Sequence, residues 1–151
     1  MSANTQAITT SFLLGLLEGV HNFGTGVVRS TTAADTFKGA LYVPDSSLGA
    51  TTTAYSATGE VSSSGYTAGG LDLTNATAPT TSGTTAYWTP SANLSWSGVT
   101  FTTDSLLVYN STQSNASVAV LTFGSQSVTS GTFTLTMPAN GATTALIQVA
   151  A

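Results

Sequence analysis

Runs in which apolar and polar residues alternate recur through the last three quarters of the chain. In the clearest run, Phe133, Leu135 and Met137 are separated by two threonines. A period of two places alternate side chains on opposite faces of a strand, so this run predicts a β-strand with one face in the core. Comparable runs, or short apolar runs between turn formers, occupy residues 37–43, 71–74, 86–89, 94–97, 106–109, 118–123 and 146–150. A further short strand at Val128, within a connection, is left open.

About seven or eight short strands, spaced by roughly ten residues, predict a mainly β fold: an antiparallel β-sandwich, jelly-roll or immunoglobulin-like, or a barrel. Residues 86–89 and 94–97 are expected to pair with each other around a break near Pro90. Turn formers predict connections at 44–59, 79–84, 110–115 (a hairpin loop), 124–131 and 138–141.

The N-terminal segment has a different, helical spacing. Apolar residues fall four positions apart at Ile8, Phe12, Leu16 and Val20, with Leu13 and Leu17 beside them. This spacing predicts one short helix, capped by a hydroxyl at residue 9, 10 or 11 and ended by the Asn-Phe-Gly segment that begins at residue 22. Two internal glycines each weaken it by about 1 kcal/mol, so it must dock on something. We therefore expect a helical arm and linker over 1–35, with the linker at 27–34, and a β-sandwich domain over 36–151.

Charge is scarce, and this excludes several classes of function. Of 151 residues, two are Lys or Arg and six are Asp or Glu, so charged residues make up 5% where soluble domains carry about 25%. Nucleic-acid binding and polybasic membrane binding both need many cations, and we expect neither. Ser and Thr, about a third of the chain, supply the polar surface. Hydroxyls discourage self-association less than mixed charges do, so the protein is expected to work in an assembled state.

The chain carries no cysteine, which excludes disulfides, thiolate nucleophiles and zinc–sulfur sites. The apolar run 12–17 is about half the length needed to cross a bilayer. No positively charged segment precedes it and no small-residue cleavage site follows, so no signal peptide is expected. The protein would then be retained in the cell or released by lysis.

Candidate catalytic groups are few. His21 lies three residues after Glu18, a spacing that would serve an acid–base pair or two metal ligands, although a histidine near a helix end and a neighbouring carboxylate are explained as well by the helix dipole. Glu60, Asp72 and Asp104 offer carboxylates for glycoside hydrolysis, but each also suits a turn or a solvated strand face. No nucleophile elbow, phosphate loop or zinc-binding helix motif occurs. We therefore expect no catalytic site, cofactor or metal.

Four aromatic residues allow two interpretations. Tyr66, Tyr87, Trp88 and Trp96 are candidates for a sugar-binding platform. The same residues are suited to core packing, which a chain so poor in charge needs from large apolar side chains. The second interpretation is favoured.

Several segments carry a resemblance to a known group of proteins. They are residues 16–21, 36–43, 48–50, 55–61, 65–70, 107–111, 119–124 and 131–136. In these segments the chain resembles small virion structural proteins of tailed bacteriophages. The resemblance covers most of the chain, brings no active-site residues with it, and implies a virion component assembled in the host cytoplasm.

The leading hypothesis is a capsid decoration (cement) protein that bridges and stabilises major capsid subunits. The expected docking interface lies on the helix, at Phe12, Leu13, Leu16, Leu17 and Val20; the alternative is that this helix packs on its own domain. A homo-oligomer is expected, with a trimer favoured by lattice symmetry. A tail or fibre-associated virion protein that binds host-surface glycans is the alternative function, and a polysaccharide hydrolase is the third.

Overall fold

The computed structural model describes residues 3–17, 19–23, 34–74 and 78–150. In this part of the chain there are one helix, α1 (Thr10–Leu17), and eight strands. The strands are β1 (Ala7–Ile8), β2 (Phe37–Tyr42), β3 (Leu71–Leu73), β4 (Thr80–Ser82), β5 (Thr85–Trp88), β6 (Leu94–Asn110), β7 (Ala116–Leu135) and β8 (Ile147–Ala150). The expectation of a mainly β fold with a short N-terminal helix is confirmed.

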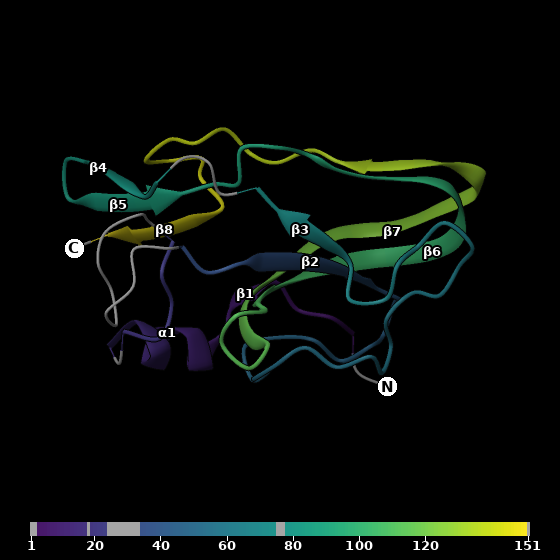
Figure 1. Cartoon of the computed structure of the whole chain (residues 1–151), viewed down its shortest axis with the longest axis horizontal. Coiled ribbons are helices and arrows are strands. Elements are labelled where there is room, and N and C mark those ends of the chain that lie inside the picture. The colour runs from purple at the N-terminus through teal and green to yellow at the C-terminus, as the bar shows by residue number, and fades with distance from the viewer. Residues whose placement is uncertain (1–2, 18, 24–33, 75–77, 151) are drawn as a thin grey trace.

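The strands form two antiparallel sheets. The larger has the order β1-β7-β6-β2-β3 and the smaller the order β4-β5-β8. In Figure 1 the small sheet and α1 lie at the same end of the molecule, and β6 and β7 extend from there to the opposite end. Every strand pair in both sheets is antiparallel, as expected.

Two strands are much longer than the alternation indicated. β6 has 17 residues and includes both 94–97 and 106–109; β7 has 20 and includes 118–123, Val128 and 133–135. The register of their pairing shifts at four places, and Gly98 and Gly124 adopt positive φ (68° and 75°). Bulges bend a strand without ending it, so the ribbon turns back on itself at the end farthest from α1 (Figure 1). The predicted connection over 124–131 is therefore wrong.

Two further expectations about strand pairing are wrong. Residues 86–89 do not pair with 94–97: β5 lies between β4 and β8, while Leu94 pairs with Leu135 of β7. The segment 79–84, expected to be a loop, contains β4. The first error concerns partners that are distant in sequence, which local patterns do not specify. The second concerns a local hairpin, in which β4 pairs with the next strand, β5.

The helix is shorter than its apolar spacing predicted. Ile8 lies in β1, paired with Ala119, and not in the helical stripe. Thr9 provides the N-cap: its Oγ1 accepts a hydrogen bond from the Phe12 amide at 3.2 Å. α1 ends at Leu17, before the positive-φ Gly19 (67°), so its extension to Val20 is also wrong. Of the predicted linker 27–34, all but Ala34 lies outside the described residues.

The N-terminal segment contributes to the same core as the sheets. Phe12 is buried and contacts the rings of His21 (4.9 Å between centroids) and Phe23 (5.9 Å). Phe23 in turn stacks on Phe37 of β2 and contacts Trp88 of β5. This aromatic chain joins α1 to both sheets. The boundary proposed at residue 35 stays a prediction.

Candidate functional site

An apolar groove lies where α1 meets the small sheet. We call it the α1 groove; its volume is about 130 Å³, and every surface that lines it is nonpolar. Its lining residues are Phe12, Leu16, Phe23, Pro79, Ala86, Tyr87, Trp88, Ile147 and Val149. A cavity of about 150 Å³ holds a benzene-sized group. The α1 groove therefore has room for one large apolar side chain.

The strand period explains why one side of the groove is apolar. Ala86 pairs with Val149 and Trp88 with Ile147, so these four side chains share one face of the β5–β8 pair. Trp88 and Ile147 are buried, whereas Val149 is 49% exposed. The core thus continues outward along this face until it reaches solvent at Val149.

The predicted docking residues have different environments. Phe12 is 1% exposed and packs in the core of its own chain, whereas Leu16 is 39% exposed at the groove. Val20 is half-buried, and the side chains of Leu13 and Leu17 are not among those described. Of the described docking residues, Leu16 is therefore the one most available to a partner.

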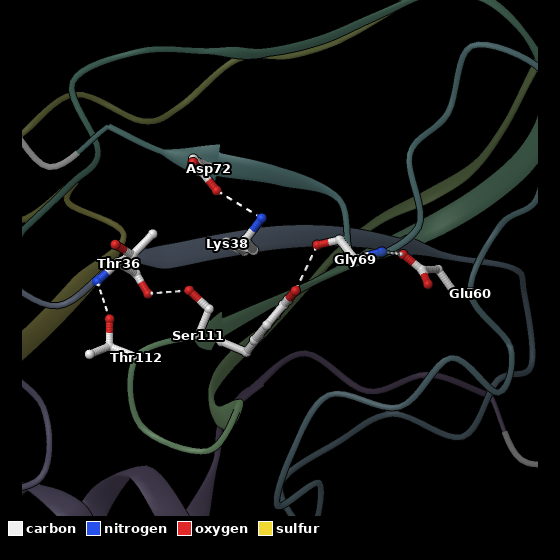
Figure 2. Close-up of polar contacts among 8 residues, drawn as sticks. Thr36, Lys38, Glu60, Gly69, Asp72, Ser111 and Thr112 are labelled. Carbon is white, nitrogen blue, oxygen red and sulfur yellow. Dashed lines mark hydrogen bonds and ion pairs between the residues drawn. The ribbon is translucent and has the colours of Figure 1, made fainter.

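A second feature is a carboxylate surrounded by tyrosines. Glu60 accepts three hydrogen bonds, each of 2.7 Å: from the hydroxyls of Tyr55 and Tyr66 and from the amide of Gly69. Figure 2 shows the Glu60 carboxylate against the Gly69 amide. We call Glu60 with Tyr42, Tyr55, Tyr66 and Tyr109 the tyrosine–Glu60 cluster.

The cluster ties the loop 55–70 to the large sheet. The Tyr66 hydroxyl accepts a hydrogen bond from the Leu41 amide of β2 at 3.0 Å, and the Tyr109 hydroxyl of β6 donates to the Gly69 carbonyl at 2.8 Å. The Tyr42 hydroxyl donates to the Ser56 carbonyl. These contacts fix a long segment that has almost no regular secondary structure.

The surroundings of the four tyrosines in the cluster keep their hydroxyls protonated. Burial, together with the hydrogen bond to Glu60 and its negative charge, raises the pKa of Tyr66 well above its usual value of about 10. Burial also raises the pKa of Tyr109 to about 12, with a further contribution from the Glu60 charge. The pKa values of Tyr42 and Tyr55 are raised for the same leading reason. All four phenols therefore remain protonated donors or acceptors, which suits a structural clamp.

A shallow depression with a mixed polar and apolar lining adjoins this cluster. It has a volume of about 200 Å³ and is lined by Glu60, Tyr66, two serines (Ser62 and Ser63) and the small apolar side chains of residues 57, 61 and 68. A carboxylate, hydroxyls and one aromatic ring are groups that can hydrogen-bond and stack on a sugar.

The other carboxylates named from the sequence are not joined to Glu60. Asp72 on β3 forms an ion pair with Lys38 on β2 at 2.9 Å (Figure 2). Asp104 accepts a hydrogen bond from Asn4 at 2.7 Å. Each has its own structural partner. Asp72 lies on an exposed strand face, as the simpler interpretation held, whereas Asp104 lies within β6 and is half-buried, and not in a turn.

His21 belongs to a buried polar network that the sequence did not reveal. The amide nitrogen of Asn110, Nδ2, lies 3.1 Å from His21 Nδ1 and 2.8 Å from Asp35 Oδ2. Asn110 is fully buried, and its Oδ1 accepts hydrogen bonds from the amides of residues 112 and 113. The network joins the N-terminal segment to the hairpin turn after β6. Glu18, the proposed partner of His21, lies outside the described residues.

The two tryptophans do not form a surface platform. Trp88 and Trp96 are each 2% exposed, and Trp96 packs between Tyr66 and Phe133. Tyr66 and Tyr87 are half-buried. The core interpretation is confirmed for the tryptophans, which both belong to the buried hydrophobic cluster.

Within the described ranges, no group of three potential metal ligands comes together, and no helix is long and apolar enough to cross a membrane. Comparisons with family models, with curated proteins and with solved structures found no match.

Proposed function

We propose that the protein is a structural component of a bacteriophage virion, a capsid decoration protein that bridges and stabilises major capsid subunits. The observation that carries the proposal is the α1 groove, an apolar surface with Leu16 and Val149 exposed on a chain with almost no charge. The resemblance to small virion proteins supplies the partner. On this proposal the fold is a β-sandwich of jelly-roll or immunoglobulin-like type, and the protein acts as a homo-oligomer, with a trimer favoured by lattice symmetry.

The groove supports this function through its size and chemistry. A hole for one large apolar side chain, rimmed by exposed apolar groups, is the kind of pocket that interface anchors occupy. Fully burying a Leu or Phe side chain contributes about 1.5–3 kcal/mol. Repeated over many copies on a shell, this contact would hold neighbouring capsid subunits together without reactive side chains.

The test replaces Leu16 with Asp and measures the amount of protein in purified particles. Leu16→Asp places a charge in the groove, so we expect a loss of most of the incorporated protein with little change in folding. Thr81→Asp, an exposed substitution on β4 outside the groove, is the matched control and should be incorporated normally. Normal incorporation of Leu16→Asp would refute docking through the groove. A point substitution is preferable to deletion of residues 1–35, which would also remove β1 and the buried Phe12.

A second candidate function rests on the depression beside Glu60. There the protein would bind host-surface glycans as a tail or fibre-associated virion component. The test is binding of purified protein to host cells and to a glycan array, with Ser62→Trp filling the depression, since Ser62 is exposed at its rim. Cell binding that Ser62→Trp abolishes would support this function, and binding that it leaves unchanged would exclude this depression.

A further inference from the structure

Among the described residues, the two open sheets end in four strands, β1, β3, β4 and β8, and three of these four edges are blocked. The outer edges of β6 and β7 that extend beyond β2 and β1 lie where bulges interrupt the ladder. An unblocked edge offers unpaired backbone N–H and C=O groups to another chain, so natural proteins cover, charge or interrupt such edges. The loop after β2 covers β1, with the Thr5 amide bonded to the Leu48 carbonyl (2.7 Å) and the Thr10 amide to the Ala50 carbonyl (2.9 Å).

The edges at β3 and β4 carry other protection. β3 is three residues long and holds the exposed Asp72, ion-paired with Lys38 of β2 (Figure 2). Charge on an edge strand disfavours the addition of another strand. β4 is also three residues long and begins directly after Pro79, which has no N–H to donate.

The fourth edge, at β8, is not covered by any loop in the described part of the chain and carries neither charge nor proline. β8 (Ile147–Ala150) contains no charge, proline or glycine. Among the residues that the structure describes, β5 is the strand that pairs with it, and nothing pairs with its other side. Gln148, Val149 and Ala150 are exposed.

We propose that the free edge of β8 is a self-association site, at which β8 of a second copy adds as an antiparallel strand. The occupant is a second copy because the edge is complementary to itself. Two antiparallel β8 strands related by a two-fold axis satisfy each other's backbone groups. With no charge on either strand, nothing repels the second copy, and the exposed Val149 side chains bury apolar surface against the partner.

The contact is short, so it is weak between free chains. Four residues per strand bury far less than the roughly 1,200 Å² of a stable interface. It becomes effective where other contacts already hold the copies close together, because the second contact then forms at a high effective concentration. The two-fold contact is independent of the virion proposal and can be measured on the purified chain.

Chemical cross-linking tests the proposal directly. The chain has no cysteine, so one introduced thiol reports one position. Gln148→Cys lies in β8, and Thr81→Cys, in β4 at the opposite edge of the same sheet, is the matched control. With a short bismaleimide at high chain concentration, we expect a covalent dimer from Gln148→Cys and only background from Thr81→Cys. Equal yields, or a dimer from Thr81→Cys alone, would overturn the proposal.

Sedimentation velocity then separates the edge from the groove. Val149→Lys puts charge at the edge and removes apolar contact, so it should weaken dimerisation by roughly tenfold or more. Leu16→Asp changes the α1 groove from the helix side and should leave dimerisation unchanged. Dimerisation that resists Val149→Lys, or that Leu16→Asp abolishes, would contradict pairing through β8.

Discussion

The tyrosine–Glu60 cluster allows a quantitative test of how the loop 55–70 is held. Replacing Glu60 with Ala removes the acceptor of two phenol donors and of the Gly69 amide, all at 2.7 Å. Hydrogen bonds to a charged group each contribute about 1.5–3 kcal/mol. Because the site is half-buried and water can replace part of this, we expect a loss of about 3 kcal/mol. For a domain of this size, that lowers the melting temperature by about 6–12 °C.

The matched control is Asp72→Ala, which also removes one carboxylate. The side chains of Asp72 and Lys38 are 67% and 33% exposed, and exposed ion pairs contribute about 0–1 kcal/mol. Urea unfolding followed by tryptophan fluorescence measures both variants, because Trp96 packs against Tyr66 of the cluster. The reasoning fails if Glu60→Ala unfolds at the same urea concentration as Asp72→Ala.

Three further predictions concern the same fold. Gly70→Ala should prevent stable folding, because at φ 73° the added Cβ would lie 1.9 Å from the Gly39 carbonyl oxygen. Gly124→Ala also has positive φ (75°) but meets open space, so it should lower the free energy of unfolding, measured by thermal denaturation, by about 1 kcal/mol. Asn110→Ala should lower the free energy of unfolding, measured by urea denaturation, by about 3 kcal/mol, because it breaks a fully buried network. Asn93→Ala, at an exposed position, should lower it by less than about 1 kcal/mol. The pKa values of the cluster tyrosines are raised above the unfolded value of about 10, so their contribution to stability is fully present below pH 10. This contribution is lost as the pH rises above 10, because the unfolded phenols ionise first. With solvent screening included, the loss at pH 11 should be roughly 2–4 kcal/mol, and an unchanged urea midpoint there would contradict it.

Local patterns predicted those parts of the fold that depend on neighbours in sequence. The apolar run 106–109 is a buried stretch of strand, and the polar segment after Asn110 is the hairpin turn. The hydroxyl cap of α1 was also predicted, at Thr9 among three candidates. In each case a short-range preference and the tertiary structure agree.

The errors arose where tertiary pairing overrides composition. Residues 124–131 have the glycine, serine and threonine content of a loop, yet they form the exposed, bent part of β7. In this exposed ribbon the backbone hydrogen bonds between β6 and β7 stabilise the strand, so its sequence does not need an alternation of apolar and polar residues. Ile8 fitted the helical spacing equally well, but its pairing with Ala119 placed it in β1.

The candidate site was predictable only in part. Leu16 was identified from the helical stripe, whereas Val149 and Trp88 join it through a small sheet whose pairing no local pattern reveals. The cluster had a local signal that was not used: Glu60 is a lone carboxylate between Tyr55 and Tyr66 in a hydroxyl-rich loop. A carboxylate in a loop without cations needs hydrogen-bond donors, and the two tyrosine hydroxyls supply two of them.

The exposed face of the β6–β7 ribbon connects the unusual composition with assembly. Its hydroxyls pair with each other across the strands, as in Ser95 with Thr134 (3.0 Å) and Thr102 with Ser127 (2.8 Å). A charged surface must lose tightly bound water when it packs against a neighbour, and that desolvation is costly. Hydroxyls that already bond to each other lose less, so this surface can pack closely at little cost.

It follows that association of this protein should not depend on ion pairs. Salt screens charged contacts over about 10 Å at 0.1 M, but it leaves apolar and backbone contacts in place. We therefore expect the yield of the Gln148→Cys cross-link to change little with added sodium chloride and to rise in ammonium sulfate, which strengthens apolar burial. A steep fall in yield with sodium chloride would mean that the few charged side chains, and not the β8 edge, hold the copies together.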